Sequence, residues 1–280
     1  MRGLRFDYLP VPGCGANIET SNPERAMNFL STVALVSLLM CVSACGGRNT
    51  ESNVRSPGAE ESPKTKALEA GAALMQDKAP IDALNAYLDG FHFYSGNMNG
   101  QMEAHHYCAH LNEELIQCVI FDGNKKDARL MGVEYIVSAA LFATLPESEK
   151  TMWHSHVHEV KSGQLIAPGI PEVAEHSLMK KLVGTYGKTF HTWHTDMQRE
   201  LPVGVPQIMM GFTGDNQIRA ELVSARDSRF GVSSERKKAD RANIDTPATL
   251  PGADAWQTGK AVQIADPNVL ESARATTPPH

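Results

Sequence analysis

The sequence lacks an excess of basic residues. It has 26 Lys and Arg against 32 Asp and Glu, which gives a formal net charge of −6. Nucleic-acid binding depends on a basic surface, so this balance argues against a nucleic-acid partner. Aromatic residues are also few, at 6%. The 42% of hydrophobic residues is nevertheless ordinary for a globular protein, so the chain can bury a core.

The sequence also lacks the short motifs that identify common enzyme classes. It has no G-x-S-x-G, no G-x-G-x-x-G and no phosphate-binding loop, which argues against an α/β-hydrolase, a dinucleotide-binding enzyme and a P-loop protein. His158-Glu159 is followed at the required position by Ser162 instead of histidine, so the zinc-protease helix motif fails. Asp, His and Ser are present, but no spacing among them marks a catalytic triad.

Charged residues are absent between Arg25 and Arg48. This apolar segment is short for a membrane span and ends in small residues, as a secretory signal peptide does. Its end, VSAC, resembles the lipobox of bacterial lipoproteins, which predicts a signal peptide over residues 1–44 and an acylated Cys45 as the membrane anchor. Gly46 follows where an aspartate would retain the protein on the inner membrane, so we expect the outer membrane of a bacterial cell envelope, facing the periplasm. A signal anchor that is left uncut is the alternative, and Met27 is an alternative initiator.

The segments next to the core are poor in bulky apolar residues. Val54 is the only bulky apolar residue in residues 45–63. Such a segment cannot bury enough apolar surface to offset its ordering entropy, so we predict a flexible, lipidated tether. Residues 233–280 predict a short charged helix followed by a loose tail. We therefore expect one core domain, residues 64–232.

Periodicity within the core predicts an α+β fold. Helices and strands follow one another without a regular β-α-β rhythm, which favours a mainly antiparallel sheet packed by helices. The predicted helices cover residues 65–76, 80–90, 134–145 and 171–188, and the predicted strands cover residues 91–94, 102–111, 115–123, 188–194 and 205–215.

Several long sequence blocks occur in one order across residues 91–231: FHFYSGNM, EAHHYCAHLNEELIQCVIFD, GVEYIVS, LPESEKTMWHSHVHEVKSGQLIAPGIP, YGKTFHTWH and LPVGVPQIMMGFT. In this combination the chain resembles the oil-body-associated protein family, a domain of unknown function. The resemblance implies a soluble domain held at a lipid surface. It supplies no catalytic residues and no cofactor. The signal peptide, the lipobox and the C-terminal tail depart from the plant pattern and make a storage-droplet role doubtful.

Histidines concentrate in the core. Ten of the eleven lie between His92 and His194. On a strand, His106 and His110 share one face, and so do His154, His156 and His158 if that segment is extended. Imidazoles at alternate strand positions can hold zinc or iron, with a carboxylate completing the set. The candidate ligands are His106, His110, His154, His156, His191, Glu134 and Glu159; the alternative is a polar sheet face of hydrogen-bonded histidines.

Cys108 and Cys118 are the only cysteines of the predicted core. A turn near Glu113 would place them opposite each other on neighbouring strands, and export would expose them to an oxidising compartment. We therefore predict a disulfide between them, with thiol ligation or plain burial as the alternatives.

Three functions are compatible with these patterns. The first is a binding or structural module at a lipid surface, with a membrane, and lipid itself, as its partner. The second is a metal-dependent periplasmic enzyme that uses the histidines. The third is a pH-responsive module whose histidines gain charge between about pH 5 and 7.

Overall fold

The computed structural model describes residues 49–265. They belong to one compact unit, Gly47–His280. The predicted signal peptide, Cys45, the alternative start Met27 and residues 266–280 lie outside the described residues. None of the described helices combines the length and the apolar character that crossing a membrane requires.

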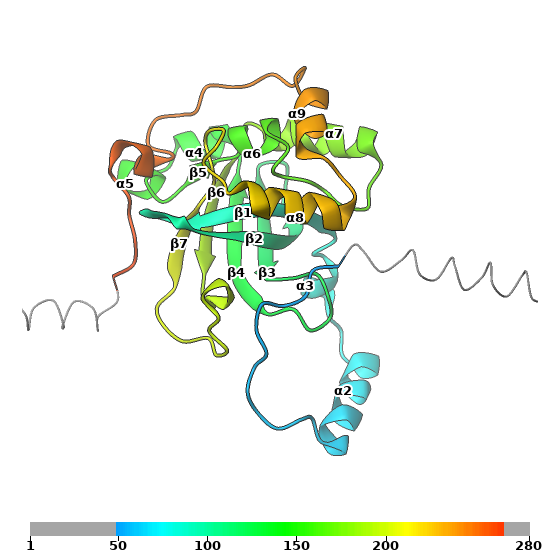
Figure 1. The fold of residues 1–280 in the computed structure, drawn as a ribbon. Coiled ribbons are helices and arrows are strands. Elements are labelled where there is room, and N and C mark those ends of the chain that lie inside the picture. The colour runs from blue at the N-terminus through cyan, green and yellow to red at the C-terminus, as the bar shows by residue number, and fades with distance from the viewer. Residues whose placement is uncertain (1–48, 266–280) are drawn as a thin grey trace, which may run out of the picture. The chain divides into compact units, whose positions relative to one another are not determined.

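Six antiparallel strands pair in a ring, so that the sheet closes on itself (Figure 1). A seventh strand, β5, pairs with β6 at Gly187 and Tyr186. The predicted α+β class with an antiparallel sheet is confirmed, whereas the closure of the sheet was not predicted. The strands are β1 (Ala86–Tyr94), β2 (Asn97–His110), β3 (Leu115–Phe121), β4 (Leu130–Val137), β5 (His154–Ser155), β6 (Tyr186–His191) and β7 (Gln207–Met210).

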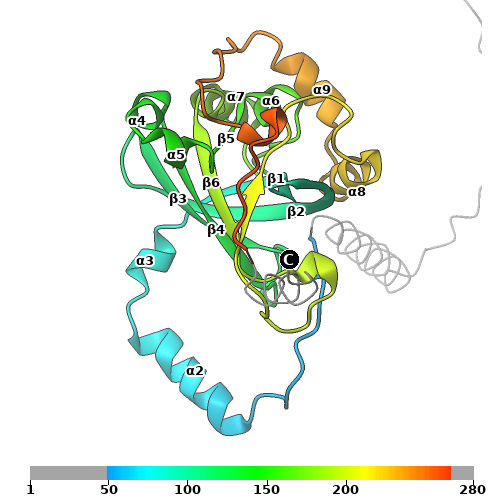
Figure 2. The same ribbon diagram turned by 90° about the vertical axis from the view of Figure 1, so that its left-hand side faces the viewer.

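Most helices gather around one end of the closed sheet, where Figures 1 and 2 both place α4, α6, α7 and α9. Helix α8 crosses the outer face of the sheet next to β2. Helix α2 stands away from the sheet in both views, and none of its residues is buried. The helices are α2 (Pro63–Met75), α3 (Ala79–Asp82), α4 (Ala139–Ala143), α5 (Glu147–Lys150), α6 (Val157–Lys161), α7 (Glu172–Leu182), α8 (Ala220–Phe230) and α9 (Ser234–Asp240), with short 3-10 turns η2 (Thr195–Met197) and η3 (Ala255–Thr258).

Strand alternation divides the side chains between the inside and the outside of the sheet. Along β2, Ala104 and Cys108 belong to two different apolar layers of the interior, and His106 lies between them. One layer contains Leu88, Cys118 and Ile136, and the other contains Met102, Ile120, Met131 and Met209. On the outer face, Phe91 and Phe93 of β1 pack beneath α8 and Trp256. The alternation therefore places polar side chains in a layer between two apolar layers.

Two predicted helices are in part strands. The helix expected over residues 80–90 ends as α3 at Asp82, and β1 begins at Ala86 and pairs with β2 along its length. The helix expected over residues 134–145 is the end of β4, followed by α4, whose N-cap is Ser138. In both segments, the apolar residues fit the spacing of a helix and that of a strand. The pairing of their backbones with neighbouring strands overrides the helical preference.

Two further boundaries differ from prediction. Helix α7 ends at Leu182, and Tyr186 and Gly187 belong to β6. The histidine-rich segment is extended only at His154 and Ser155, and α6 begins at Val157. His158 consequently lies on a helix and does not share a face with His154.

The segments that flank the predicted core pack against it within residues 49–265. Asp254 accepts hydrogen bonds from the backbone N–H (3.0 Å) and the hydroxyl (2.6 Å) of Ser155, and Trp256 packs against Phe93. Val54 is buried, and the neighbouring Asn53 N–H donates to Asp122. The expectation of a disordered tether and a loose tail is therefore wrong around Val54 and Asp254, whereas residues 55–63 of the predicted tether are exposed. A few well-placed side chains are enough to dock a segment whose average composition is polar.

Cys108 and Cys118 face each other across β2 and β3, as the predicted hairpin required. Their Cα atoms lie 4.1 Å apart and their sulfurs form a disulfide. The bond joins two strands inside an apolar layer of the interior, and it leaves no thiol in the described residues for metal ligation.

Candidate functional site

The polar layer inside the sheet consists almost entirely of imidazoles and carboxylates. Its members come from β1, β2, β4, β5, α6 and β6 and from the N-cap of α6, and each has at most 6% of its surface exposed. We call this set the interior cluster: His92, His106, Glu134, His154, His156, Glu159 and His191.

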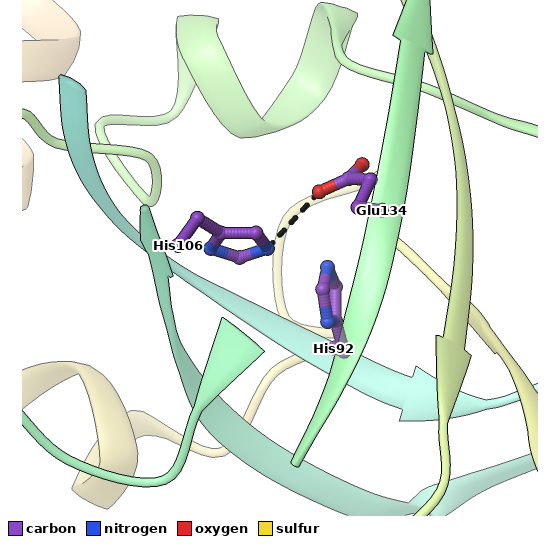
Figure 3. Close-up of side chains that lie close together, drawn as sticks. All are labelled: His92, His106 and Glu134. Atoms are coloured by element: carbon purple, nitrogen blue, oxygen red, sulfur yellow. Dashed lines mark ion pairs between the residues drawn. The ribbon is translucent and has the colours of Figure 1, made fainter. Parts of the chain in front are cut away.

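Glu134 lies at the centre of the interior cluster. Its Oε2 is 3.0 Å from Nε2 of His106, and its Oε1 is 3.2 Å from Nε2 of His156 and 3.4 Å from Nε2 of His154. Figure 3 shows Glu134 reaching from β4 toward His106, with His92 beside both. Two groups of three side chains share this carboxylate, His92–His106–Glu134 and Glu134–His154–His156, and in each group the ligand atoms lie within 4.8 Å of one another.

Burial inside the sheet and contacts within the interior cluster shift the pKa values of these groups. Burial alone would raise the pKa of Glu134, but the histidines around it, His106 first, hold that pKa well below its usual range. Glu159 lacks such compensation, so burial raises its pKa to about 8. Burial lowers the pKa of His191 to about 3 and that of His92 well below its usual value. His92 and His191 are therefore neutral at pH 7, and Glu134 is ionised.

Hydrogen bonds fix the tautomers of two histidines. Nδ1 of His106 lies 3.1 Å from the carbonyl oxygen of Ala104, which can only accept, so Nδ1 carries the proton. The Thr185 hydroxyl donates to Leu182 O (2.7 Å) and therefore accepts from Nδ1 of His156 at 2.8 Å. When these rings are neutral, both present a lone pair on Nε2 toward Glu134.

Several ring nitrogens of the interior cluster have no hydrogen-bond partner within the described part of the chain. They are Nε2 of His106, both nitrogens of His154 and Nδ1 of His191. His92 and His191 contact each other, with Nδ1 and Nε2 3.3 Å apart. Buried polar atoms are rarely left unpartnered in a folded protein, so this concentration requires a cause.

Two glycines make room for the carboxylates. A Cβ at Gly187 would lie 2.8 Å from the His154 ring and would overlap Glu134. A Cβ at Gly211 would lie 3.0 Å from His154 and would overlap Glu159. Only glycine at these two positions lets the side chains converge. The two carboxylates also line a cavity of about 20 Å³, which is room for one water molecule. Its lining includes His92, His106, Glu134, His156 and Glu159.

The structure brings together most of the residues that the sequence singled out, but not all of them. His110 is exposed at the end of β2, because strand alternation fixes the face of a side chain and not its depth in the interior. His158 lies on α6, with Nε2 4.0 Å from Asp215. His92 was missed. It stands between Phe91 and Phe93, and its alternation with these two buried phenylalanines was the available signal.

A second polar network lies on the outer face, beneath α8. Arg226 is fully buried and donates to Asp89 Oδ1 (3.0 Å), to Ser234 Oγ (3.0 Å) and to the carbonyl oxygens of Gln164 and Gly163. Asp89 also pairs with Nδ1 of His105 at 3.0 Å. Each charge has a partner of opposite sign, so this network can hold α8 to the sheet without any ligand.

The chain was compared with known proteins. Residues 78–245 match a family described as protein of unknown function (DUF1264). Oil body-associated protein 1A of Zea mays is 43% identical over 225 residues, which are 80% of this chain and 94% of that protein. Oil body-associated protein 1B of Arabidopsis thaliana is 44% identical over 199 residues, 71% of this chain and 83% of the relative. Oil body-associated protein 2C of Arabidopsis thaliana is 38% identical over 208 residues, 73% and 88% respectively. No solved structure matches the chain.

Proposed function

The chain belongs to the DUF1264 family, and from this premise we propose that it is a binding or structural module that works at a lipid surface. The relatives named oil body-associated proteins resemble it along most of its length, which supports a lipid-surface role. The VSAC segment supports the further proposal that the chain is a bacterial lipoprotein, anchored through Cys45 to the outer membrane and facing the periplasm.

The structural observation that carries this proposal is helix α2. Leu68, Leu74 and Met75 are 64%, 86% and 79% exposed, and no other described element covers them. An isolated helix of 13 residues is marginally stable in water, so an apolar face of this kind needs a surface to pack on. Leu68 and Met75 lie two turns apart on one face of the helix, and Lys64 and Lys66 stand at its start. A helix with apolar side chains and terminal lysines suits the interface of a membrane that contains anionic lipid.

Helix α2 should supply the affinity of the unacylated protein for lipid. In a chain of residues 46–280, the double change Leu68→Asp and Met75→Asp should weaken binding to phosphatidylcholine–phosphatidylglycerol vesicles by more than about ten-fold, since burying one such side chain contributes roughly 1.5–3 kcal/mol. Vesicle flotation measures this. Val173→Asp is the matched control, because Val173 is 82% exposed on α7 and should not matter. Equal flotation of the double variant and the unchanged chain would contradict the proposal.

Cys45 should carry the anchor. Cys45→Ala should prevent acylation and cleavage, because signal peptidase for lipoproteins requires the cysteine after the cut. One acyl chain binds membranes only marginally and several bind stably, so we expect the mature protein to be fully membrane-bound and the variant to keep the longer, unprocessed chain. Gel mobility, palmitate labelling and membrane fractionation report the result. Cys41→Ala, four residues earlier, is the control and should change nothing. Normal labelling and mobility of the Cys45 variant would refute the anchor.

A further inference from the structure

We propose that the interior cluster binds a divalent transition-metal ion, with Glu134 as its central ligand and the histidines around Glu134 as the others. This metal site is independent of lipid binding. It rests on four features of the described residues: opposed lone pairs, unpartnered ring nitrogens, the spacing of the ligand atoms, and the charge of the interior.

The first feature is the direction of the lone pairs. Ala104 and Thr185 hold the protons of His106 and His156 on Nδ1, so each neutral ring directs the lone pair of Nε2 at a carboxylate oxygen of Glu134. Two lone pairs 3.0–3.2 Å apart repel each other unless a proton or a metal ion lies between them. Metal-binding histidines commonly donate their other N–H to a carbonyl or hydroxyl oxygen in this way, which fixes the ring and its tautomer.

The second feature is His154. Its side chain is completely buried, and neither ring nitrogen has a hydrogen-bond partner among residues 49–265. A buried ring nitrogen without a partner destabilises the fold, so a ligand that binds it would be stabilising. Nε2 of His154 lies 3.4 Å from Oε1 of Glu134, to which His156 is also close. Coordination of one ion by Glu134, His154 and His156 would remove the penalty at Nε2 of His154.

The third feature is spacing. Ligand bonds of 2.0–2.1 Å place neighbouring ligand atoms about 2.8–3.0 Å apart in octahedral coordination and about 3.3–3.4 Å apart in tetrahedral coordination. The three distances from Glu134 to His106, His156 and His154 are 3.0, 3.2 and 3.4 Å. Each of these distances fits two neighbouring ligands of one ion, and the ligand atoms form two groups that share Glu134, one with His92 and His106 and one with His154 and His156.

The fourth feature is charge and ligand type. Glu134 supplies a buried negative charge to a bound cation, and Glu159 is a second buried carboxyl group in the same cluster. Imidazole nitrogen with carboxylate oxygen suits zinc, iron(II) and manganese(II), whereas calcium and magnesium prefer oxygen alone. The cavity of about 20 Å³ beside His92, His106 and Glu134 leaves room for one water as a remaining ligand.

Metal content tests the proposal. The full chain, expressed with added zinc, iron and manganese and then dialysed, should hold at least one of these metals at one ion per chain when measured by plasma mass spectrometry. Glu134→Gln and His156→Ala should each reduce that content to below about a tenth. The matched controls Glu114→Gln and His110→Ala change an exposed glutamate and an exposed histidine, and should leave it unchanged.

Thr185 offers a test that keeps every ligand. It acts as a positioning residue through Nδ1 of His156, so Thr185→Val should weaken zinc affinity by about ten- to a hundred-fold in a chelator competition, while Thr185→Ser restores it. This pair remains informative if Glu134→Gln does not fold. A wild-type chain free of stoichiometric metal, or a Glu134→Gln chain that folds and retains it, would overturn the proposal. Equal zinc affinity of Thr185→Val and Thr185→Ser would do the same.

Discussion

Replacing Arg226 with alanine should lower the free energy of unfolding by about 3–5 kcal/mol, the range for breaking a buried ion pair from one side. The change leaves Asp89 buried without its guanidinium partner and removes the donor from two carbonyl oxygens, those of Gln164 and Gly163. Burial would by itself raise the pKa of Asp89, and His105 and Arg226 together lower it. Without Arg226, the carboxylate keeps the cost of burial and loses part of its compensation. Urea unfolding followed by circular dichroism measures the effect.

The control for Arg226 is an arginine whose ion pair faces solvent. Arg236 is 77% exposed in its side chain and lies 3.8 Å from Asp240, one turn along α9. Exposed pairs of this kind contribute little, so Arg236→Ala should stay within about 0.5 kcal/mol of the unchanged protein. If Arg226→Ala cost no more than that, the outer network would not be what holds α8 to β1 and β2.

Phe142→Ala should cost a similar amount, about 3–5 kcal/mol, because it removes a large ring from a closed part of the core. Phe142 on α4 is completely buried and stacks on Tyr186 with ring centroids 4.0 Å apart. Trp153, its other aromatic neighbour, comes directly before His154. The cavity left by alanine therefore weakens the support of β5, and we expect metal affinity to fall together with stability.

The matched control for Phe142 is Tyr135→Ala. Tyr135 is an aromatic residue on β4 that is 44% exposed, so removing its ring leaves no closed cavity and should cost less than about 1 kcal/mol. Thermal melting of both variants, with and without added zinc, separates the packing effect from the site. Equal melting temperatures for the two variants would show that the core relaxes around the missing ring.

The sequence could predict elements whose pattern is local. The β2–β3 hairpin, with Cys108 opposite Cys118, followed from alternation and one turn. The α9 helix followed from a short charged segment, and in the structure Ser233 is its N-cap. Strand β1 could not be predicted in the same way. The spacing of Leu84 and Leu88 suits either a helix or a strand. Only the pairing of β1 with both β2 and β7 decides between them, and those partners lie far apart in the chain.

The site was predictable to the same extent. Alternation correctly placed His106 on the interior face of β2, but it gave His110 the same face and could not show that the strand emerges into solvent there. His92 carried a weak signal, a single imidazole between two phenylalanines. The central role of Glu134 depends on the closure of β4 against β6, which no local pattern in the sequence encodes. Long-range pairing was therefore the missing information for the fold and the site alike.

The closed sheet has a consequence for the proposed role at a lipid surface. An open sheet ends in strands whose free N–H and C=O groups can pair with another molecule, and this is a common route to aggregation. In residues 49–265, each of the six strands in the ring has a neighbour on both sides, and β5 is only two residues long. Copies crowded on one surface would therefore lack the backbone templates through which sheets polymerise. They could reach a high local density and remain separate molecules.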